Sequence, residues 1–191
     1  MSVHPDTAPG ALVGVVLCGG ASRRMGRDKA LVPVGGVPMA QRVADALRHA
    51  GCEPVVVVGG DGAALRDLGM QVVPDLHPGE GPLGGLITAL RSFAHASAVV
   101  VVACDLPWLG AGSISSVVAA MAPQVEAAVG RTDRVQPLVG AWRPSALPLL
   151  EAAFAAGERR LRAVLHDLHA AMVDLPEAEL ANVNTPDDLR Q

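Results

Sequence analysis

A cluster of basic residues follows the first hydrophobic run of the chain. The cluster consists of Arg23, Arg24, Arg27 and Lys29. Gly19 and Gly20 precede it, and glycines let a backbone turn sharply so that its N–H groups can bind phosphate oxygens. The spacing fits neither GxxxxGK[ST] nor GxGxxG. We interpret the segment as a polyphosphate-binding loop of another kind, against the alternative of a glycine turn with a solvated basic face.

Lys29 is the only lysine among the 15 basic residues of the chain. A protein that otherwise uses arginine places its one compact ammonium group in this loop. Lysine binds phosphate as a point charge, whereas arginine presents a planar fork. The composition therefore favours a specific role for Lys29.

Two carboxylates follow predicted strands. Asp105 ends the most hydrophobic run, Ala98–Cys104, and Asp75 follows a shorter one. Mg²⁺ usually takes one or two protein carboxylates and fills its other positions with water and phosphate. We predict that Asp105 is a magnesium ligand and that Asp75 is a weaker candidate, the alternative for Asp105 being a turn residue before Pro107.

Glycines and amides mark two further segments. Gly84 and Gly85, at the start of a predicted helix, would allow close contact with a base or ribose, or alternatively tight helix packing. Asn182 and Asn184 would share one side of a final strand. Thr185–Asp188 reads as a helix cap.

Composition excludes several classes of protein. The net charge of −4 argues against a generally basic nucleic-acid or membrane-surface protein. The longest apolar run has seven residues, Ala98–Cys104, far short of a membrane span, and the N-terminus does not resemble a signal peptide. Three separated cysteines suit reduced thiols, so we expect a cytoplasmic protein. His166 and His169 lack partners for a metal site, and no hydrolase triad is apparent.

Hydrophobic strand patterns alternate with helical ones. The strands are expected at Leu12–Leu17, Pro54–Gly59, Gln71–Pro74, Ala98–Ala103, Glu126–Val129, Pro137–Trp142 and Ala171–Asp174, and the helices at Pro38–Ala50, Gly62–Leu68, Pro82–Phe93, Ser113–Met121, Ser145–Ala156 and Arg159–His169. Runs such as Val55–Val58 indicate strands buried on both faces. We predict a single-domain, Rossmann-like α/β fold over residues 11–191, with a mostly parallel sheet, helices on both faces and a disordered leader over residues 1–10. Ligands of such folds bind beyond the carboxyl ends of the strands.

Four segments resemble one family in order along the chain. They are LCGGASRRMGRDKALVPVGGVPM, VPDLHPGEGPLGGLITAL, ACDLPWL and NVNTPDDL. Together they resemble the signature of the nucleotidyltransferases that attach a nucleotide to the molybdopterin cofactor, across residues 12–190. The first two segments are similar to the guanine-specific type. Cys18 replaces the family's usual alanine, and an asparagine often used for nucleotide binding is unmatched at Gly59–Asp61.

The resemblance implies transfer of GMP from GTP to molybdopterin, with release of pyrophosphate and formation of a guanine dinucleotide cofactor. It places GTP against Leu17, Cys18, Gly19, Gly20, Lys29, Asp75, Gly84 and Asp105. Asp105 would hold Mg²⁺, and Lys29, Arg23 and Asp105 would carry catalysis. Asn182, Asn184 and Gln136 would border the pterin. Cofactor-insertion chaperones and molybdoenzymes are the implied partners.

Three alternatives remain at this stage. A cytidylyltransferase acting on the same pterin would share the fold and the chemistry. A sugar-phosphate nucleotidyltransferase uses a similar glycine-rich loop, although this chain lacks room for a large sugar domain. A non-catalytic nucleotide-binding module would bind nucleotide without releasing pyrophosphate.

Overall fold

The valine-rich runs of the sequence form the centre of a seven-stranded sheet, which the computed structural model describes together with its surroundings over residues 8, 10–19, 28–183 and 188. The strands are β1 (Leu12–Cys18), β4 (Val55–Gly59), β5 (Gln71–Val73), β6 (Ala98–Ala103), β7 (Ala127–Arg131), β8 (Val135–Trp142) and β9 (Ala170–Asp174). Their order is β5-β4-β1-β6-β8-β7-β9. The pairs are parallel except for those of β8, which runs antiparallel to β6 and β7.

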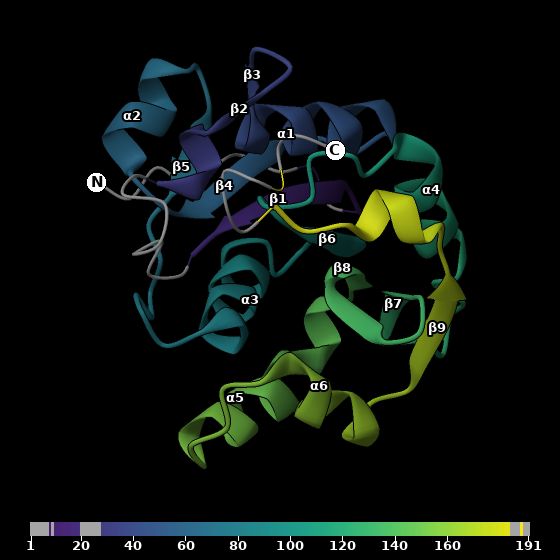
Figure 1. Ribbon diagram of the computed structural model, residues 1–191. Helices are drawn as coiled ribbons and strands as arrows, with labels where there is room; N and C mark the ends of the chain where they lie inside the picture. The colour runs from purple at the N-terminus through teal and green to yellow at the C-terminus, as the bar shows by residue number, and fades with distance from the viewer. Residues whose placement is uncertain (1–7, 9, 20–27, 184–187, 189–191) are drawn as a thin grey trace.

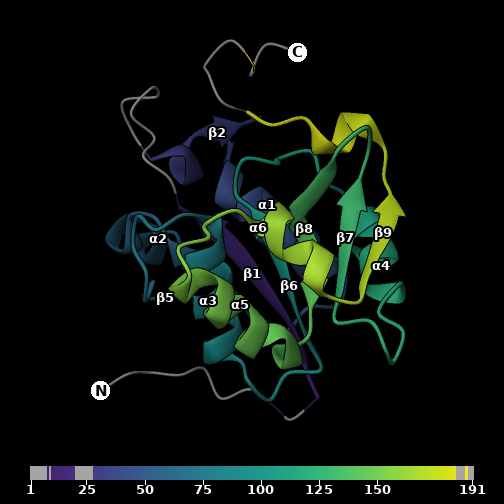
Figure 2. The ribbon, with the colours of Figure 1, turned by 90° about the horizontal axis from the view of Figure 1, so that it is seen from below.

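Helices cover both faces of this sheet (Figures 1 and 2). They are α1 (Met39–His49), α2 (Gly62–Asp67), α3 (Pro82–Ser92), α4 (Ala111–Ala119), α5 (Leu147–Ala155) and α6 (Leu161–Val164), with short 3₁₀ turns η1 (Lys29–Leu31), η2 (Pro144–Ala146), η3 (Leu165–Asp167) and η4 (Glu177–Leu180). Two apolar clusters result. One packs α3, α5 and α6 against the sheet, and the other packs α1, α2 and α4 against its opposite face.

The predicted fold class is confirmed, including the mostly parallel sheet and the helices on both faces. Each predicted strand from residue 12 to residue 174 is present, with ends shifted by at most two residues. The expected helix over Arg159–His169 is shorter than predicted. Its first residues are extended because Glu158 Oε1 accepts hydrogen bonds from the N–H groups of Arg159 and Arg160, and only Leu161–Val164 is α-helical.

Two local features differ from expectation. A small hairpin, β2 (Pro33–Val34) and β3 (Val37–Pro38), was not predicted; its turn uses Gly35 and Gly36, both with positive φ, as a tight two-residue hairpin requires. The final strand expected around Asn182 is absent, since residues 181–183 are irregular. Instead Val183 packs with Val32 and Met39 and donates its N–H to the Asp105 carbonyl at 3.0 Å.

None of the helices within the described residues has the length and apolarity needed to cross a bilayer. The predicted leader over residues 1–10 lies almost entirely outside the described part of the chain and stays a prediction, as does the domain boundary at residue 11.

Gly14 of β1 is closely packed against Leu47 of α1 and against Cys52 and Val55, which generates a prediction about stability. A Cβ at this position would stand 3.0 Å from both Cys52 Cβ and Val55 Cγ2. Gly14→Val should lower the free energy of unfolding by about 1–3 kcal/mol, because overfilling a packed core forces neighbours to move. Urea denaturation measures this.

A control comes from Gly112 in α4, whose added Cβ would meet nothing within 4 Å. Gly112→Ala should be neutral or should stabilise the protein by about 0.4–1 kcal/mol. Equal stability of Gly14→Val and the wild type would contradict the packing described.

Cys52 generates a prediction about pH. Burial raises the pKa of its thiol to about 12. The native state therefore keeps a proton that the unfolded chain loses near pH 9, so stability is fully present below pH 9 and falls as the pH rises from 9 toward 12. Between pH 8 and pH 10 the wild type should lose about 1.4 kcal/mol more than Cys52→Ala, at 1.36 kcal/mol per unit of pKa difference. Parallel loss in both proteins, measured by denaturation at each pH, would show that this thiol ionises normally.

Candidate functional site

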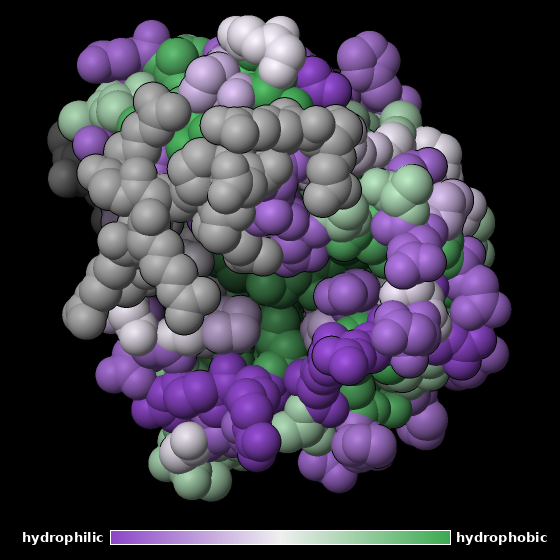
Figure 3. Space-filling model, viewed as in Figure 1, coloured by the Kyte–Doolittle hydropathy of each residue, from purple (hydrophilic) through white to green (hydrophobic). Residues whose placement is uncertain are grey.

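A large cleft opens at the carboxyl ends of the parallel strands. It has a volume of about 1860 Å³. Figure 3 shows the hollow in this face, with apolar atoms in its floor. Described residues that line it on the β1, β4 and β6 side include Leu17, Cys18, Gly19, Asp28, Lys29, Gly60, Asp75, Gly85, Cys104 and Asp105. The space exceeds that of a typical small-ligand pocket, about 300–1,000 Å³, and suits two ligands side by side.

The strand order explains why the cleft lies here. From β1 the chain builds outward through β4 to β5 and then returns to β6 on the other side of β1. The ends of β1 and β6 therefore diverge at the topological switch point, the usual ligand site of open α/β sheets. Cys18–Gly19 and Cys104–Asp105 are the residues at these two ends.

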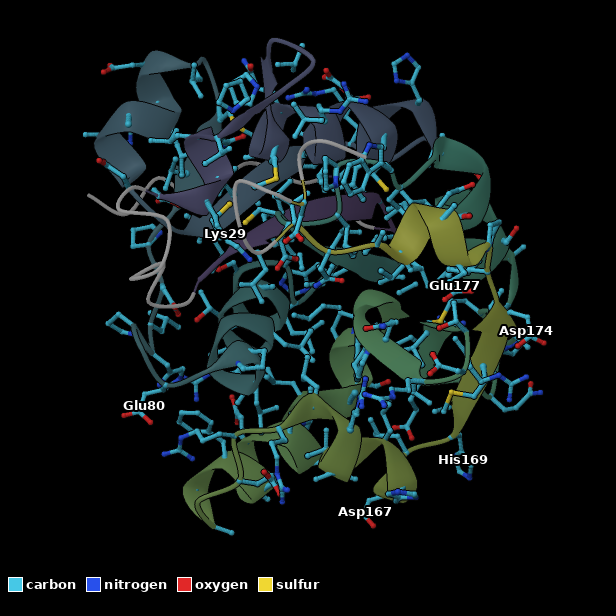
Figure 4. The ribbon with its side chains drawn as sticks, in the orientation of Figure 1. Lys29, Glu80, Asp167, His169, Asp174 and Glu177 are labelled. Carbon is cyan, nitrogen blue, oxygen red and sulfur yellow. The ribbon has the colours of Figure 1, made fainter. Side chains whose placement is uncertain are left out.

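Lys29 and Asp105 form an ion pair at this point. Lys29 Nζ lies 3.1 Å from Asp105 Oδ2, and the two side chains are only 18% and 20% exposed. The other carboxylate oxygen, Asp105 Oδ1, is buried and accepts no hydrogen bond from the described residues. A buried carboxylate oxygen without a donor is unfavourable unless a ligand occupies it. The pair therefore combines a cation and an open acceptor at one site; Figure 4 shows Lys29 near the centre of the molecule.

Asp28 fixes the segment that carries Lys29. Its Oδ1 accepts the N–H of Ala30 at 3.0 Å and caps η1, while its Oδ2 accepts the N–H of Asp61 at 2.6 Å. Asp61 in turn caps α2. Position 60, next to the hydrogen bond between Asp28 and Asp61, requires glycine. Its φ is +74°, and a Cβ there would lie 3.0 Å from Asp28 Oδ2. Sequence reasoning gave Asp28 no role, although an Asx cap two residues before Ala30 is a recognisable signal.

Asp75 lines the cleft at the end of β5. Its Oδ1 accepts hydrogen bonds from the hydroxyl of Thr88 at 2.8 Å and the N–H of His77 at 3.0 Å. Thr88 lies on α3 and is fully buried. The weaker of the two carboxylate candidates is therefore held by a buried hydroxyl that the sequence did not single out.

The two adjacent glycines of α3 have different surroundings. A Cβ on Gly85 would lie within van der Waals overlap of Leu17 Cδ1, and Gly85 lines the cleft. A Cβ on Gly84 would lie 2.8 Å from His77 Cβ, and Gly84 is absent from the described lining. For Gly84 the geometry favours the alternative of tight packing, and its predicted contact with GTP stays a prediction.

Cys18 and Cys104 are neighbours, which their separation in the sequence did not indicate. Val16 pairs with Val102 in the β1–β6 register, so residues two further on extend to the same face. Their thiols are hydrogen bonded, and this contact together with burial raises the pKa of Cys18 well above its usual range. Cys18 is therefore a protonated, packed thiol in the wall of the cleft.

The opposite wall of the cleft comes from β8 and the segment around α6. Its described residues are Gln136, Pro137, Leu138, Val139, Arg160, Leu161, Arg162, Ala163 and His166. Asn182 also lines the cleft but lies beside Asp105, because the N–H of the next residue, Val183, binds the Asp105 carbonyl oxygen. Gln136 and Asn182, both predicted, lie in the lining. Arg160 and Arg162 were missed because Arg159–His169 was interpreted as a surface helix. His169 lies away from the cleft, as does Asp167, at the outer edge of the molecule (Figure 4).

A cluster of side chains joins the two walls at the outer end of α3. Arg159 Nε donates to Glu80 Oε2 at 2.7 Å, and its guanidinium lies 4.0 Å from the ring centre of Phe154. The same ring contacts His77, with centroids 4.6 Å apart. The Asp75–Gly81 loop is thereby attached to the segment that carries Arg160 and Arg162.

Some predicted site residues lie outside the described residues. They are Gly20, Arg23 and Asn184, together with the neighbouring cations Arg24 and Arg27. Within the described part of the chain, no group of three or more His, Cys, Asp or Glu side chains could hold a metal ion.

The sequence and fold match known proteins over most of their length. The family model of the MobA-like NTP transferase domain matches residues 14–172. A Xanthomonas euvesicatoria protein named molybdenum cofactor guanylyltransferase is 39% identical over 180 residues, which cover 91% of this chain and 90% of that protein.

Solved structures also match the fold of this chain. Molybdopterin-guanine dinucleotide biosynthesis protein A from Archaeoglobus fulgidus is 26% identical, with a TM-score of 0.76 over 94% of this chain and 95% of that one. A Mycobacterium tuberculosis H37Rv protein crystallised with manganese shares the fold, at 20% identity and a TM-score of 0.66, over 94% of this chain and 96% of its own.

Proposed function

The chain belongs to the MobA-like NTP transferase family, and we propose that it transfers GMP from GTP to molybdopterin, forming the guanine dinucleotide cofactor and releasing pyrophosphate. The observation that carries the proposal is the Lys29–Asp105 pair at the switch point of the sheet, with one buried carboxylate oxygen left open. It offers a cation for phosphate and an acceptor for a metal ion within one cleft. Nucleotidyl transfer needs both.

Magnesium is the proposed cofactor, and the residues present fit it. Asp105 Oδ1 is buried without a hydrogen-bond donor among the described residues, and a hard oxygen ligand is what Mg²⁺ prefers. When bound there, the ion would neutralise phosphate charge and polarise the α-phosphate. A single protein carboxylate suffices because phosphate oxygens and water complete an octahedral shell.

The nucleotide is proposed to lie along the β1–β6 side of the cleft. Leu17, Cys18, Gly19 and Gly20 would contact the nucleoside and its phosphates through backbone and small side chains, and Asp75 would accept a hydrogen bond from it. Lys29 and Arg23 would offset the charge of the triphosphate and of the leaving pyrophosphate. The described part of the cleft lining contains no Phe, Trp or Tyr, so we expect guanine to be bound without stacking on such a ring.

Molybdopterin is proposed to occupy the opposite wall. Gln136 lies there, whereas Asn182 lines the cleft beside Asp105 and Asn184 follows two residues later. Arg162 adds a positive charge to the same wall, and Arg160 adds a guanidinium whose charge is partly offset by its ion pair with Glu158. A basic wall suits the terminal phosphate of the acceptor. The cleft volume of about 1860 Å³ accommodates both substrates at once.

The reaction requires no nucleophile from the protein. A terminal phosphate oxygen of molybdopterin attacks the α-phosphorus of GTP, the bond from that phosphorus to the bridging oxygen breaks, and pyrophosphate leaves with the electron pair. The two walls hold the phosphates in line, and Lys29 stabilises charge that develops on the leaving group. Cys18, whose pKa is raised by its contact with Cys104 and by burial, does not compete as a nucleophile.

A pyrophosphate-release assay with molybdopterin, Mg²⁺ and each of the four nucleoside triphosphates tests the proposal. Release with GTP and formation of the dinucleotide are expected. Preference for CTP would identify a cytidylyltransferase, and nucleotide binding without pyrophosphate release would identify a non-catalytic module. We further propose a cytoplasmic enzyme, with residues 11–191 as its transferase domain, that hands its product to insertion chaperones and molybdoenzymes.

Asp105→Asn should reduce kcat by roughly 10²–10³-fold, as loss of one preorganised charge contact does in other enzymes. The amide keeps the shape of the side chain but loses the charge that holds a metal ion. The variant should stay folded at assay temperature, although its unfolding temperature falls because Lys29 loses its partner charge. The matched control is Asp174→Asn on β9, which alters an exposed ion pair with Arg131 on β7. It should keep full activity. Normal turnover by Asp105→Asn would remove the metal assignment.

Lys29→Arg should also lose activity by at least about tenfold, although charge is conserved. The Lys29 side chain is only 18% exposed and reaches Asp105 at 3.1 Å, which leaves little room for a larger planar guanidinium. Steady-state kinetics of the GTP reaction measure the loss. Arg48→Lys, in an exposed pair with Asp45, serves as the reverse exchange on the surface. If Lys29→Arg works as well as this control, a compact ammonium is unnecessary.

A further inference from the structure

Thr88 is a hydroxyl residue in the otherwise apolar buried face of α3. Its neighbours in that face include Leu83, Leu86 and Ile87, and Thr88 itself has no exposed surface. A buried hydroxyl requires hydrogen-bond partners. Those partners are all at the start of α3 or in the loop before it.

Three hydrogen bonds converge on Thr88 Oγ1. It accepts the N–H of Leu76 at 3.1 Å and lies 2.8 Å from Asp75 Oδ1 and 3.0 Å from the Gly84 carbonyl oxygen. A hydroxyl carries one proton, so it donates fully to only one of the last two. The carboxylate is the shorter and, being charged, the stronger acceptor. The hydroxyl therefore bridges the Leu76 amide and the Asp75 carboxylate.

The two carboxylate oxygens of Asp75 therefore have different surroundings. Oδ1 takes the Thr88 hydroxyl and the His77 N–H, whereas Oδ2 makes no hydrogen bond to the described residues. Asp75 lines the cleft. One oxygen is thus bound to the protein and the other remains for a ligand.

We propose that Thr88 is a positioning residue for nucleotide binding: it holds the Asp75 carboxylate so that Oδ2 accepts a hydrogen bond from a base or ribose donor of the nucleotide. The inference rests on the proposed function, because it takes the β1–β6 side of the cleft as the nucleotide site. Thr88 touches no substrate itself. Its effect passes through Asp75 and the 74–77 segment.

The test compares Thr88→Val with Thr88→Ser. Valine keeps the volume and branching but removes the hydroxyl, whereas serine keeps the hydroxyl. For Thr88→Val we expect the Kd and KM for GTP to rise about tenfold, the scale of one lost hydrogen bond, with kcat and the KM for molybdopterin within about twofold of wild type. Thr88→Ser should restore the affinity for GTP.

Ser92→Ala is the matched control. Ser92 lies one turn further along α3, and its hydroxyl donates to the Thr88 carbonyl at 2.8 Å without contacting Asp75. Its removal should leave GTP binding unchanged. In an Asp75→Ala background, Thr88→Val should have almost no further effect on the Kd for GTP, because coupled residues are not additive.

The outcomes separate the inference from the proposed function. Wild-type affinity for GTP in Thr88→Val, or an undiminished effect of Thr88→Val without Asp75, overturns the inference while the transferase stands. If Thr88→Val and Thr88→Ser both lost kcat and molybdopterin affinity as much as GTP affinity, the result would indicate that Thr88 has a role in folding only. That result would also overturn the inference. If the wild type neither binds GTP nor releases pyrophosphate, the proposed function fails. In that case, faster hydrogen exchange of the Leu76 amide in Thr88→Val but not Thr88→Ser would still support the loop-holding contact, and unchanged exchange would refute it.

Discussion

The site depends on one electrostatic arrangement, the partly buried pair of Lys29, at the start of η1, and Asp105, which follows β6. Charges removed from water are costly unless they are paired, so the fold must bring these two residues together across 76 positions of sequence. It does so by reversing the strand order at β1. Asp28 holds the Lys29 side through its contacts with Ala30 and Asp61, and the Val183 N–H holds the Asp105 backbone from the other side. The pairing leaves Asp105 Oδ1 buried without a hydrogen-bond donor among the described residues, an arrangement that a bound cation would complete.

Much of the fold follows from local pattern. The valine runs at residues 55–58 and 99–102 are apolar at every position, and a strand buried on both faces belongs in a parallel sheet covered by helices. The predicted boundaries of an element were wrong where a side chain binds backbone N–H groups at its start. Glu158 caps two N–H groups and shortens the helix expected over Arg159–His169, and no periodicity reveals that. The Gly35–Gly36 turn between Val34 and Val37 was available as a hairpin signal, and its omission was an error of interpretation.

The site was predictable to the extent that strand ends could be located. Asp105, Asp75 and Gly19 follow predicted strands, and Lys29 was singled out as the only lysine of the chain. All four line the cleft. The contact between Cys18 and Cys104 could not be predicted in the same way, because it requires the knowledge that β1 and β6 are neighbours in a given register. The same is true of Thr88, which in sequence is one polar residue in an apolar helix. Arg160 and Arg162 face the cleft only because α6 packs beside β8, a long-range arrangement that no local signal encodes.

The two walls of the cleft are mechanically connected, and this bears on how two substrates are handled. The Asp75–Gly81 loop is attached at its inner end by Thr88 and at its outer end by the Glu80–Arg159 pair. Arg159 is followed directly by Arg160, in the wall of the cleft that we propose for the acceptor. The outer pair is exposed and by itself contributes at most about 1 kcal/mol, but the Phe154 ring beneath Arg159 and the His77 ring against Phe154 add packing to it. A displacement of the Asp75–Gly81 loop would therefore be transmitted to the segment that carries Arg160. In a reaction between two anionic phosphates, such a connection fixes the distance between attacking and attacked groups, and alignment of this kind is the main contribution available to an enzyme that supplies no nucleophile.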